Sequence, residues 1–405
     1  MEFSLLGLVV VLEPNSHRCP KSFVIIHPMT RRDACRHFTS FLATSSFLRS
    51  QQTDLLNVFD FEPACKAKVT KAAYDYVSGG AWDEWTMRRN RSAFEKIIFR
   101  PRFFRRVDEL DLTTSVLGQK LNLPILIAPT GTHNLLHPEG ELATARGAGA
   151  AGAHMVVSTS SSFPIQKISE VAKAPLWFQL YTGPDLETTR ERVANAVAAG
   201  CKAVCVTVDA PYSAPRERDQ RNRLVRSLPE HSLARRRQRE GESDSPAKTP
   251  FGLPMRFQAK LDWSFLDQLC GYAKVPVLVK GVLTPEDAQL SIQHGAAGVV
   301  VSNHGGRYLD GDPATIDVLP EIVDAIGSRA TVLIDGGFRR GTDVLKALAI
   351  GAKAVLVGRP PLWGLGAMGA EGVQRVMEIL RNELAMAMAL AGRPSIASID
   401  RSLIR

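Results

Sequence analysis

Cysteine is scarce and scattered in this sequence. The 405 residues include six cysteines, namely Cys19, Cys35, Cys65, Cys201, Cys205 and Cys270. None forms a CxxC pair, and no group of cysteine and histidine has the spacing of zinc ligands, so no metal site is expected. Cys201 and Cys205 lie in an apolar stretch, which predicts buried thiols. The pattern fits a protein of a reducing compartment.

Long apolar runs are also missing. The stretch from Phe3 to Leu12 is too short to span a bilayer, and it lacks the positive start of a secretory signal. Arg31 and Arg32 precede a moderately apolar stretch, which is typical of a twin-arginine export signal starting at Met29. The alternative is a disordered or mis-started leader. We therefore predict an extension over residues 1–53, a folded domain over 54–405, and a cytoplasmic protein unless the leader acts in export.

Positive charge is not spread evenly. The formal net charge is +9, and residues 210–260 alone hold twelve Lys/Arg against six Asp/Glu. Charge concentrated in one segment favours a local loop function over a surface that coats nucleic acid, so no nucleic-acid partner is expected. The run "RRRQR" at 235–239 leaves contact with an anionic membrane or nucleic acid as an additional hypothesis, which salt-dependent binding would reveal.

What the sequence does contain is a rhythm of short apolar runs and longer helical patterns. Most of the runs are almost continuously apolar, which favours strands of a parallel sheet buried on both faces. Glycine often precedes a run, in the position that ends a helix, and Thr284-Pro285 has the pattern of a helix start. Eight such runs occur, at 123–129, 154–159, 176–181, 203–208, 275–281, 297–303, 330–336 and 354–359.

Eight strands that alternate with helices predict an α/β fold, the (β/α)8 TIM barrel. A doubly wound open sheet is the alternative. Residues 65–80 predict a helix before the barrel that ends at glycine. The connection over 210–260, after the fourth strand, is far longer than usual. It predicts a lid-like loop, mobile over about 224–256, or simply a solvated loop.

Polar residues gather where the predicted strands end, which is where barrel enzymes place their chemistry. A lysine inside an apolar strand is costly to bury, so Lys280 predicts a cofactor that carries negative charge. Glycine pairs and arginines after the last two strands are typical of a phosphate site. The polar groups at the eight ends are Thr130, Ser158, Gln179 with Tyr181, Thr207 with Asp209, Lys280, Ser302 with His304 and Arg307, Asp335 with Arg339, and Arg359.

Three motifs together carry a resemblance to a known family. They are "SNHGGRYLDG" at 302–311, "LIDGGFRRGTDVLKALAIGAKAVLVGRPPLWGL" at 333–365 and "YDYVSGGAWDEWTMRRNRSAFEKIIFRPR" at 74–102. From about residue 55 to the C-terminus, the chain resembles the FMN-dependent α-hydroxy acid dehydrogenases and oxidases. The resemblance implies an enzyme that binds FMN and oxidises an L-2-hydroxy acid, lactate-like or larger, to the 2-oxo acid.

The resemblance also implies roles for individual residues. His304 takes the hydroxyl proton as the hydride passes to flavin N5, and Asp209 holds the resulting imidazolium; a carbanion route is the alternative. Arg307 and Arg216 bind the substrate carboxylate, while Tyr76 and Tyr181 donate hydrogen bonds to the substrate. Lys280 stabilises the reduced flavin. The remaining cofactor-binding residues implied are Pro129, Thr130, Gly131, Ser158, Gln179, Thr207, Ser302, Asp335, Gly336, Gly337, Arg339, Gly358 and Arg359.

A few positions depart from the family pattern. Ala214 replaces a glycine that is usual near Arg216, Gly131 stands where several members have alanine, and Ser160 stands where some have a bulky aromatic. The last two predict space for a substrate larger than glycolate. The electron acceptor is open between oxygen, a quinone and another carrier, and a homotetramer is expected. Another FMN-barrel oxidoreductase or isomerase that shares the phosphate site is the alternative function.

Overall fold

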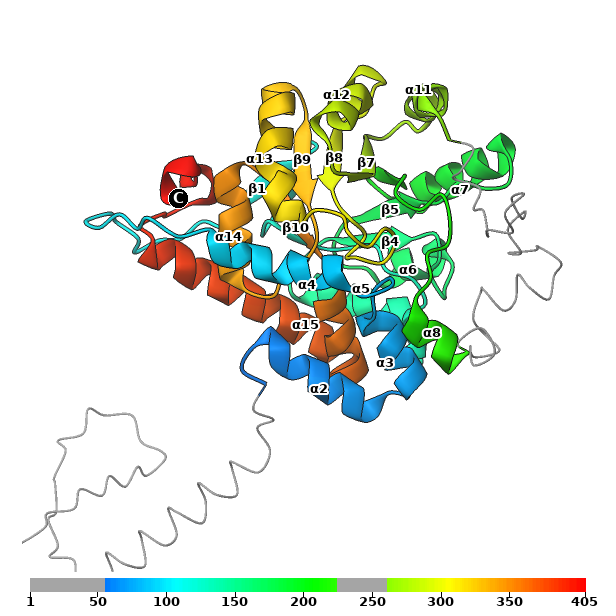
Figure 1. The fold of residues 1–405 in the computed structure, drawn as a ribbon, viewed down its shortest axis with the longest axis horizontal. Coiled ribbons are helices and arrows are strands. Elements are labelled where there is room, and N and C mark those ends of the chain that lie inside the picture. Colours follow the sequence, from blue (N-terminus) through cyan, green and yellow to red (C-terminus); the bar gives the residue numbers. More distant parts are fainter. Residues whose placement is uncertain (1–54, 224–260) are drawn as a thin grey trace, which may run out of the picture. The chain divides into compact units, whose positions relative to one another are not determined.

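The computed structural model describes residues 55–223 and 261–405. Eight parallel strands close into a barrel in the order β10-β3-β4-β5-β6-β7-β8-β9 (Figure 1). The predicted (β/α)8 barrel is confirmed, and the open-sheet alternative is wrong because β10 pairs with β3. The strands are β3 Ile125–Ile127, β4 Met155–Ser158, β5 Leu176–Leu180, β6 Val204–Thr207, β7 Val277–Val282, β8 Gly298–Val301, β9 Thr331–Ile334 and β10 Ala354–Val357. The predicted extension over 1–53 and loop over 224–256 lie outside the described residues.

The barrel interior is layered along the strands. An apolar layer of buried side chains fills its middle, formed by Leu126, Val156, Trp177, Cys205, Leu278, Val300, Leu333 and Leu356. Because side chains of a strand alternate between its faces, the residue two positions further along points the same way. These next residues are mostly polar: Ala128, Ser158, Gln179, Thr207, Lys280, Ser302, Asp335 and Gly358. A polar layer therefore rests on a packed apolar floor at the carboxyl end of the barrel.

Helices surround the barrel and follow its strands (Figure 1). The start of α12 has the capping chemistry that the sequence predicts. Thr284 caps α12 by accepting a hydrogen bond from the Asp287 amide, with Pro285 in the first turn. The barrel helices are α5 Gly140–Ala150, α6 Ile165–Val171, α7 Leu186–Ala198, α11 Trp263–Tyr272, α12 Pro285–Gln293, α13 Thr315–Ile326, α14 Gly341–Ile350 and α15 Arg359–Leu390. Cys201 and Cys205 are buried thiols, as predicted.

Several elements lie outside the repeating pattern. The predicted helix over 65–80 is in fact two helices, because Thr70 leaves the helical conformation and caps the second one. The first of them packs along α15 (Figure 1). These elements are α2 Val58–Lys68, α3 Lys71–Ser78, α4 Trp85–Ser92, η1 Ala93–Lys96, the hairpin of β1 Thr114–Val116 and β2 Gln119–Leu121, η2 His133–Leu135, α8 Glu217–Asn222, η4 Gly327–Arg329, η5 Ile396–Ser398 and η6 Arg401–Leu403. Within 55–223 and 261–405, no helix is long and apolar enough to cross a membrane.

Candidate active site

A cavity of about 180 Å³ opens above the polar layer of the barrel. Most of the residues singled out from the sequence line it. They are Tyr76, Pro129, Thr130, Gly131, Ser158, Tyr181, Arg216, Lys280, His304, Arg307, Asp335, Gly336, Gly337, Arg339, Gly358 and Arg359. Many of them follow the ends of different strands, while Tyr76 comes from α3 and Arg216 precedes α8. Thus one cavity brings together groups that are far apart in the sequence.

Three of the predicted residues lie in the layer that supports the cavity. Gln179 accepts a hydrogen bond from the Ser158 hydroxyl at 3.0 Å and donates one to the Thr207 hydroxyl at 2.9 Å. Ser302 accepts from the Lys280 ammonium at 2.8 Å. These bonds connect neighbouring strands of the barrel, so the side chains of the polar layer are held in one arrangement.

His304 is held between a carboxylate and a phenol. Its Nδ1 lies 2.9 Å from Asp209 Oδ1, and its Nε2 lies 3.3 Å from the Tyr181 hydroxyl. The backbone of His304 has a φ of 55°, an uncommon conformation for a residue other than glycine, and its amide donates to Ser302 Oγ at 3.1 Å. The turn after β8 therefore presents Nε2 to the cavity with a fixed orientation.

Burial and charge act in opposite directions on this pair. Burial lowers the pKa of His304 below its ordinary value, although Asp209 partly opposes the shift. Burial alone would raise the pKa of Asp209, but His304 and Lys280 bring it below its ordinary value. The result is a neutral imidazole beside an ionised carboxylate, which is the state of a proton acceptor with a counter-charge in place.

Gly281 makes the approach of Asp209 possible. With a φ of 110°, it has a conformation that favours glycine, and a Cβ built there would lie 2.6 Å from the Cβ of Asp209. A larger residue after Lys280 would displace the carboxylate from His304.

Two arginines that line the cavity lie over one tyrosine ring, which lines it too. The guanidinium carbons of Arg307 and Arg216 lie 5.2 and 5.4 Å from the centre of the Tyr76 ring. Arg307 Nη1 donates to the carbonyl oxygens of Tyr76 and Gly79, at 2.8 and 3.0 Å. Arg216 Nε donates to Asp219 at 2.6 Å. Two planar cations that face one cavity form a good receptor for a carboxylate.

The charges of these arginines are not equally compensated. Burial and the positive charge of Arg216 lower the pKa of Arg307. Burial also opposes the charge of Arg216, but Tyr76 and Asp219 raise its pKa on balance. A bound anion would therefore stabilise the charged form of Arg307 more than that of Arg216.

Lys280 has a protein counter-charge. Its side chain is almost fully buried, and Nζ lies 3.2 Å from Asp335 Oδ2. Burial lowers its pKa, but Asp335 and Asp209 outweigh burial, and the ammonium form is retained. Asp335 at the end of β9 thus supplies a counter-charge from the protein itself, which the sequence did not predict.

The end of the cavity formed by the turns after β9 and β10 holds two arginines without such carboxylates. Arg359 donates to the carbonyl oxygens of Val77, Gly79 and Gly305, at 3.1, 2.9 and 3.0 Å. Arg339 lies over the Trp363 ring at 4.6 Å. Within the described residues, neither forms an ion pair. Burial lowers the pKa of Arg339 to about 10 and that of Arg359 to about 9, so this end has positive charge in need of an anion.

Comparison with known proteins now decides the family. The family model described as FMN-dependent dehydrogenase matches residues 65–405. The chain belongs to the FMN-dependent dehydrogenase family. Its cofactor is therefore FMN, and it is an oxidoreductase.

Members of this family that resemble the chain include oxidases. L-lactate oxidase of Nostoc sp. is 46% identical over 357 residues, which cover 86% of this chain and 98% of that protein. Glycolate oxidase of Spinacia oleracea is 42% identical, over 87% of this chain and 96% of its own length. Among solved structures, mandelate oxidase with (S)-2-phenylpropionate superposes with a TM-score of 0.78 at 36% identity, covering 86% and 98% of the two chains.

The cavity fits FMN on two independent features. Arg339 and Arg359 have no carboxylate partner among the described residues, and a phosphate would supply the negative counter-charge. Asp335 Oδ1 is buried without a hydrogen-bond partner, and a hydroxyl of the ribityl chain is a donor of the kind that it needs. Arg339 and Arg359 would then hold the phosphate of FMN, and Asp335 its ribityl chain.

The two positions predicted to enlarge the cavity differ in the structure. A Cβ at Gly131 would lie 2.8 Å from Ser160 Cβ and 2.9 Å from its carbonyl oxygen. Gly131 therefore creates no space, because the Ser160 segment fills it. Ser160 and Gly131 both line the cavity, so the prediction of added space now rests on the short side chain of Ser160.

Sequence reasoning missed residues that support the site. Tyr308 packs edge-on against His304, with ring centres 4.6 Å apart. His133 lies 2.7 Å from the Thr130 hydroxyl and is fully buried. Tyr308 directly follows Arg307 in the motif at 302–311 and could have been found there. Nothing in the local pattern around His133 points to the cavity.

Proposed function

We propose that this chain oxidises an L-2-hydroxy acid to the corresponding 2-oxo acid. The observation that carries the proposal is the position of His304 Nε2 in one cavity with the guanidinium groups of Arg307 and Arg216. A 2-hydroxy acid presents a carboxylate and a hydroxyl on adjacent carbons, which match these two kinds of group. The names of the related lactate, glycolate and mandelate oxidases agree with this substrate class.

In this proposal, each residue has one task. Arg307 and Arg216 bind the carboxylate, and Tyr76 keeps both guanidinium groups in place. His304 accepts the hydroxyl proton at Nε2, where Tyr181 is already within hydrogen-bonding distance. Asp209 stabilises the imidazolium that forms. FMN, when bound, supplies the acceptor of the two electrons.

We also propose which residues hold FMN. Arg339, Arg359 and the amides of the glycine turn at 336–337 bind the phosphate, and Asp335 binds the ribityl chain. Lys280 would face the flavin ring, and its retained charge would favour the reduced, anionic form. The remaining contacts are assigned to Pro129, Thr130, Gly131, Ser158, Gln179, Thr207, Ser302 and Gly358.

Replacement of His304 tests the proposed function. His304→Ala should abolish turnover of 2-hydroxy acids, because no other group in the cavity combines a neutral nitrogen with a counter-charge. Flavin absorbance of the purified variant should show FMN retained in full, since His304 is placed at the substrate. Full turnover in the FMN-loaded variant would overturn the assignment.

We propose further that the substrate carries a side chain larger than that of glycolate. The short Ser160 side chain at the cavity wall supports this. Values of kcat/KM should rise from glycolate to lactate and larger 2-hydroxy acids. Ser160→Trp should reverse the order, by raising KM for the larger acids and leaving glycolate nearly unchanged. A wild-type enzyme that prefers glycolate would contradict this proposal.

Three other features remain proposals. The oxidase names of relatives support oxygen as the electron acceptor over a quinone or another carrier. Anaerobic reduction followed by admission of air should yield one hydrogen peroxide per 2-oxo acid.

We propose a homotetramer, which light scattering would measure, and a cytoplasmic location. Fractionation of the full chain and of a chain starting at Met29 would separate that location from export or peripheral membrane contact.

A further inference from the structure

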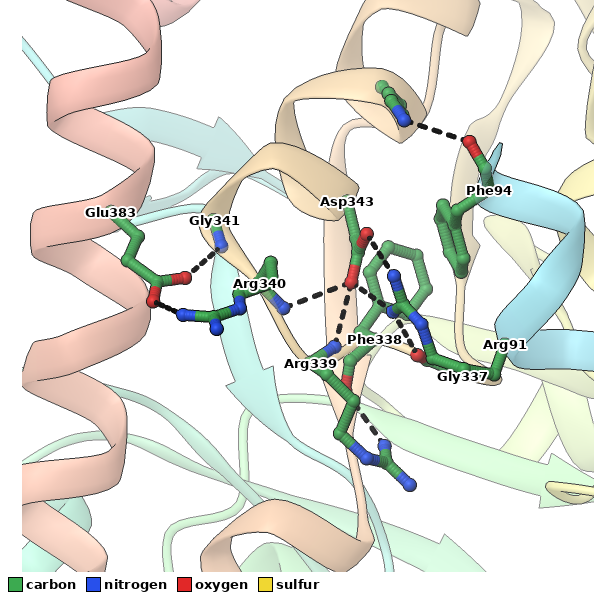
Figure 2. Close-up of polar contacts among 10 residues, drawn as sticks. Arg91, Phe94, Gly337, Phe338, Arg339, Arg340, Gly341, Asp343 and Glu383 are labelled. Carbon is green, nitrogen blue, oxygen red and sulfur yellow. Dashed lines mark hydrogen bonds and ion pairs between the residues drawn. The ribbon is translucent and has the colours of Figure 1, made fainter. Parts of the chain in front are cut away.

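Asp343 in α14 is a buried carboxylate that the reaction does not use. It is only 1% exposed and lies just after the turn that carries Arg339. Its Oδ2 accepts hydrogen bonds from the backbone amides of Arg339 and Arg340, both at 2.9 Å (Figure 2). Its Oδ1 accepts from Arg91 Nη2 at 2.9 Å, and Arg91 Nη1 bonds to Oδ2. One carboxylate thus binds four donors from two parts of the chain.

Arg91 extends the same contact to the start of the turn. It comes from α4, and its Nη1 also donates to the carbonyl oxygen of Gly337 at 2.9 Å (Figure 2). Asp343 and Arg91 together therefore hold both ends of the segment 337–340. The backbone of Gly337 itself lies close to α4, since a Cβ there would be 2.1 Å from the carbonyl oxygen of Asn90.

Between the two ends, the segment has one apolar anchor. Phe338 is 1% exposed and packs edge-on against Phe94, with ring centres 5.0 Å apart. Its carbonyl oxygen accepts from Arg339 Nη1 at 2.8 Å. The direction of the Arg339 side chain is thus linked to the backbone conformation that Asp343 and Arg91 maintain.

We propose that Asp343 is a positioning residue for the FMN phosphate. It acts through the segment 337–340, by fixing the amides and the Arg339 guanidinium in the arrangement that receives the phosphate. The inference rests on the proposed phosphate role of Arg339 and Arg359.

Charge and geometry make opposite predictions for this residue. Asp343 brings a negative charge close to the phosphate site, which by Coulomb's law alone disfavours an anion. Asp343→Asn removes that charge at nearly constant size. If charge dominated, the variant would bind FMN more tightly. If positioning dominates, it binds FMN less tightly, because an amide nitrogen cannot accept the bonds that hold the turn.

The experiment compares FMN with riboflavin, which lacks the phosphate. Apoprotein of the full chain is titrated by equilibrium dialysis. The FMN-to-riboflavin affinity ratio is the riboflavin dissociation constant divided by the FMN dissociation constant, so this ratio falls when FMN binding weakens. Asp343→Asn should weaken FMN binding about tenfold, as expected for losing charge-assisted hydrogen bonds, and change riboflavin binding little. Tighter or unchanged FMN binding, or an equal loss for both flavins, would overturn the proposal.

Glu383 offers a matched control. It binds the adjoining positions, accepting from Arg340 Nη1 at 2.6 Å and the Gly341 amide at 2.8 Å (Figure 2). Those groups do not face the cavity, so Glu383→Gln should lower the melting temperature of the apoprotein but leave the FMN-to-riboflavin ratio unchanged. A ratio that falls as far as in Asp343→Asn would mean that general loosening of α14 explains the result.

Two more variants keep the test decisive. Arg91→Lys retains the charge but loses the fork that joins Asp343 and Gly337, so the ratio should again fall; it also serves if Asp343→Asn does not fold. An unchanged ratio would contradict the inference. Arg359→Ala tests the proposed phosphate site itself: if that variant keeps the wild-type ratio, the site assignment fails, whereas a loss there with none in Asp343→Asn defeats only the positioning role.

Discussion

The two ends of the cavity handle charge differently. At the substrate end, His304 lies against Asp209 and Arg216 against Asp219, so protein carboxylates accompany two of the three groups there, while Arg307 donates to carbonyl oxygens. At the phosphate end, Arg359 has carbonyl oxygens as acceptors and, within the described residues, no ion pair. The first arrangement suits a charge that appears and disappears in each turnover. The second suits an anion that stays bound. Such an anion binds tightly because it neutralises cations that otherwise repel one another.

After loss of His304 itself, the largest effect is expected for Asp209→Asn at the substrate end. Without the carboxylate, the imidazolium that forms on His304 is unsupported, and kcat should fall about 10²- to 10⁴-fold. Asp209 raises the pKa of His304, so the variant should have a still lower pKa. Because His304 must be neutral to accept a proton, the acid limb of the kcat/KM profile should move to lower pH. A limb that moves to higher pH would contradict the assigned role.

Arg307→Lys should have the next largest effect, and only at the same end. Lysine keeps the charge but cannot hold the Tyr76 and Gly79 carbonyls and a carboxylate with one planar group. We expect kcat/KM for a 2-hydroxy acid to fall about 100-fold, the size of a lost charge-assisted contact. FMN affinity, measured by dialysis, should stay at the wild-type value. Loss of FMN in this variant would show that the two ends are not separate.

A change of pH should act mainly at the phosphate end. The apoprotein has a pKa of about 9 for Arg359 and about 10 for Arg339, below the ordinary value for arginine. Both cations are fully present at pH 7 and decline as pH rises through these values. FMN binding should therefore weaken about tenfold for each unit of pH above 9, if one arginine must be protonated. Riboflavin binding, measured in parallel, should change less.

The same lowered pKa values affect stability with the opposite sign. The unfolded chain binds protons at these arginines more tightly than the folded apoprotein, so their contribution to apoprotein stability improves as pH rises from 8 to 10. Bound FMN removes this contribution by restoring the positive charge. The difference in melting temperature between holoprotein and apoprotein should therefore narrow over this range. A constant difference would refute the uncompensated charge at this end.

The smallest effect is expected where the two ends meet. The Gly79 carbonyl accepts from both Arg307 and Arg359, and the next residue, Gly80, donates to Glu84 at 2.9 Å. Glu84 also pairs with Arg218 of α8 at 2.5 Å. Glu84→Gln should raise KM and the FMN dissociation constant together by less than about fivefold, because a partly exposed pair contributes little. Kinetics and dialysis on one preparation would measure both.

Much of the fold and of the site composition could be predicted from the sequence. All eight strands coincide with predicted apolar runs, because strands buried on both faces need uninterrupted apolar residues. Many of the polar residues that line the cavity follow from the position of polar groups at strand ends, whereas Tyr76 and Arg216 followed from the family resemblance. The helix over 65–80 was the local error: α2 ends where Val69 turns extended, and the Thr70 side chain caps the start of α3.

The sequence pattern could not predict which side chains contact one another across the barrel. Lys280 pairs with Asp335 from β9, Arg91 of α4 with Asp343 of α14, and Ser160 closes on Gly131. Each of these contacts joins segments that are distant in the sequence. Periodicity and composition therefore determined the barrel and the kinds of group at its rim. The tertiary structure alone decided their charge state and direction, because pairing and burial depend on distances across the barrel that no local pattern specifies.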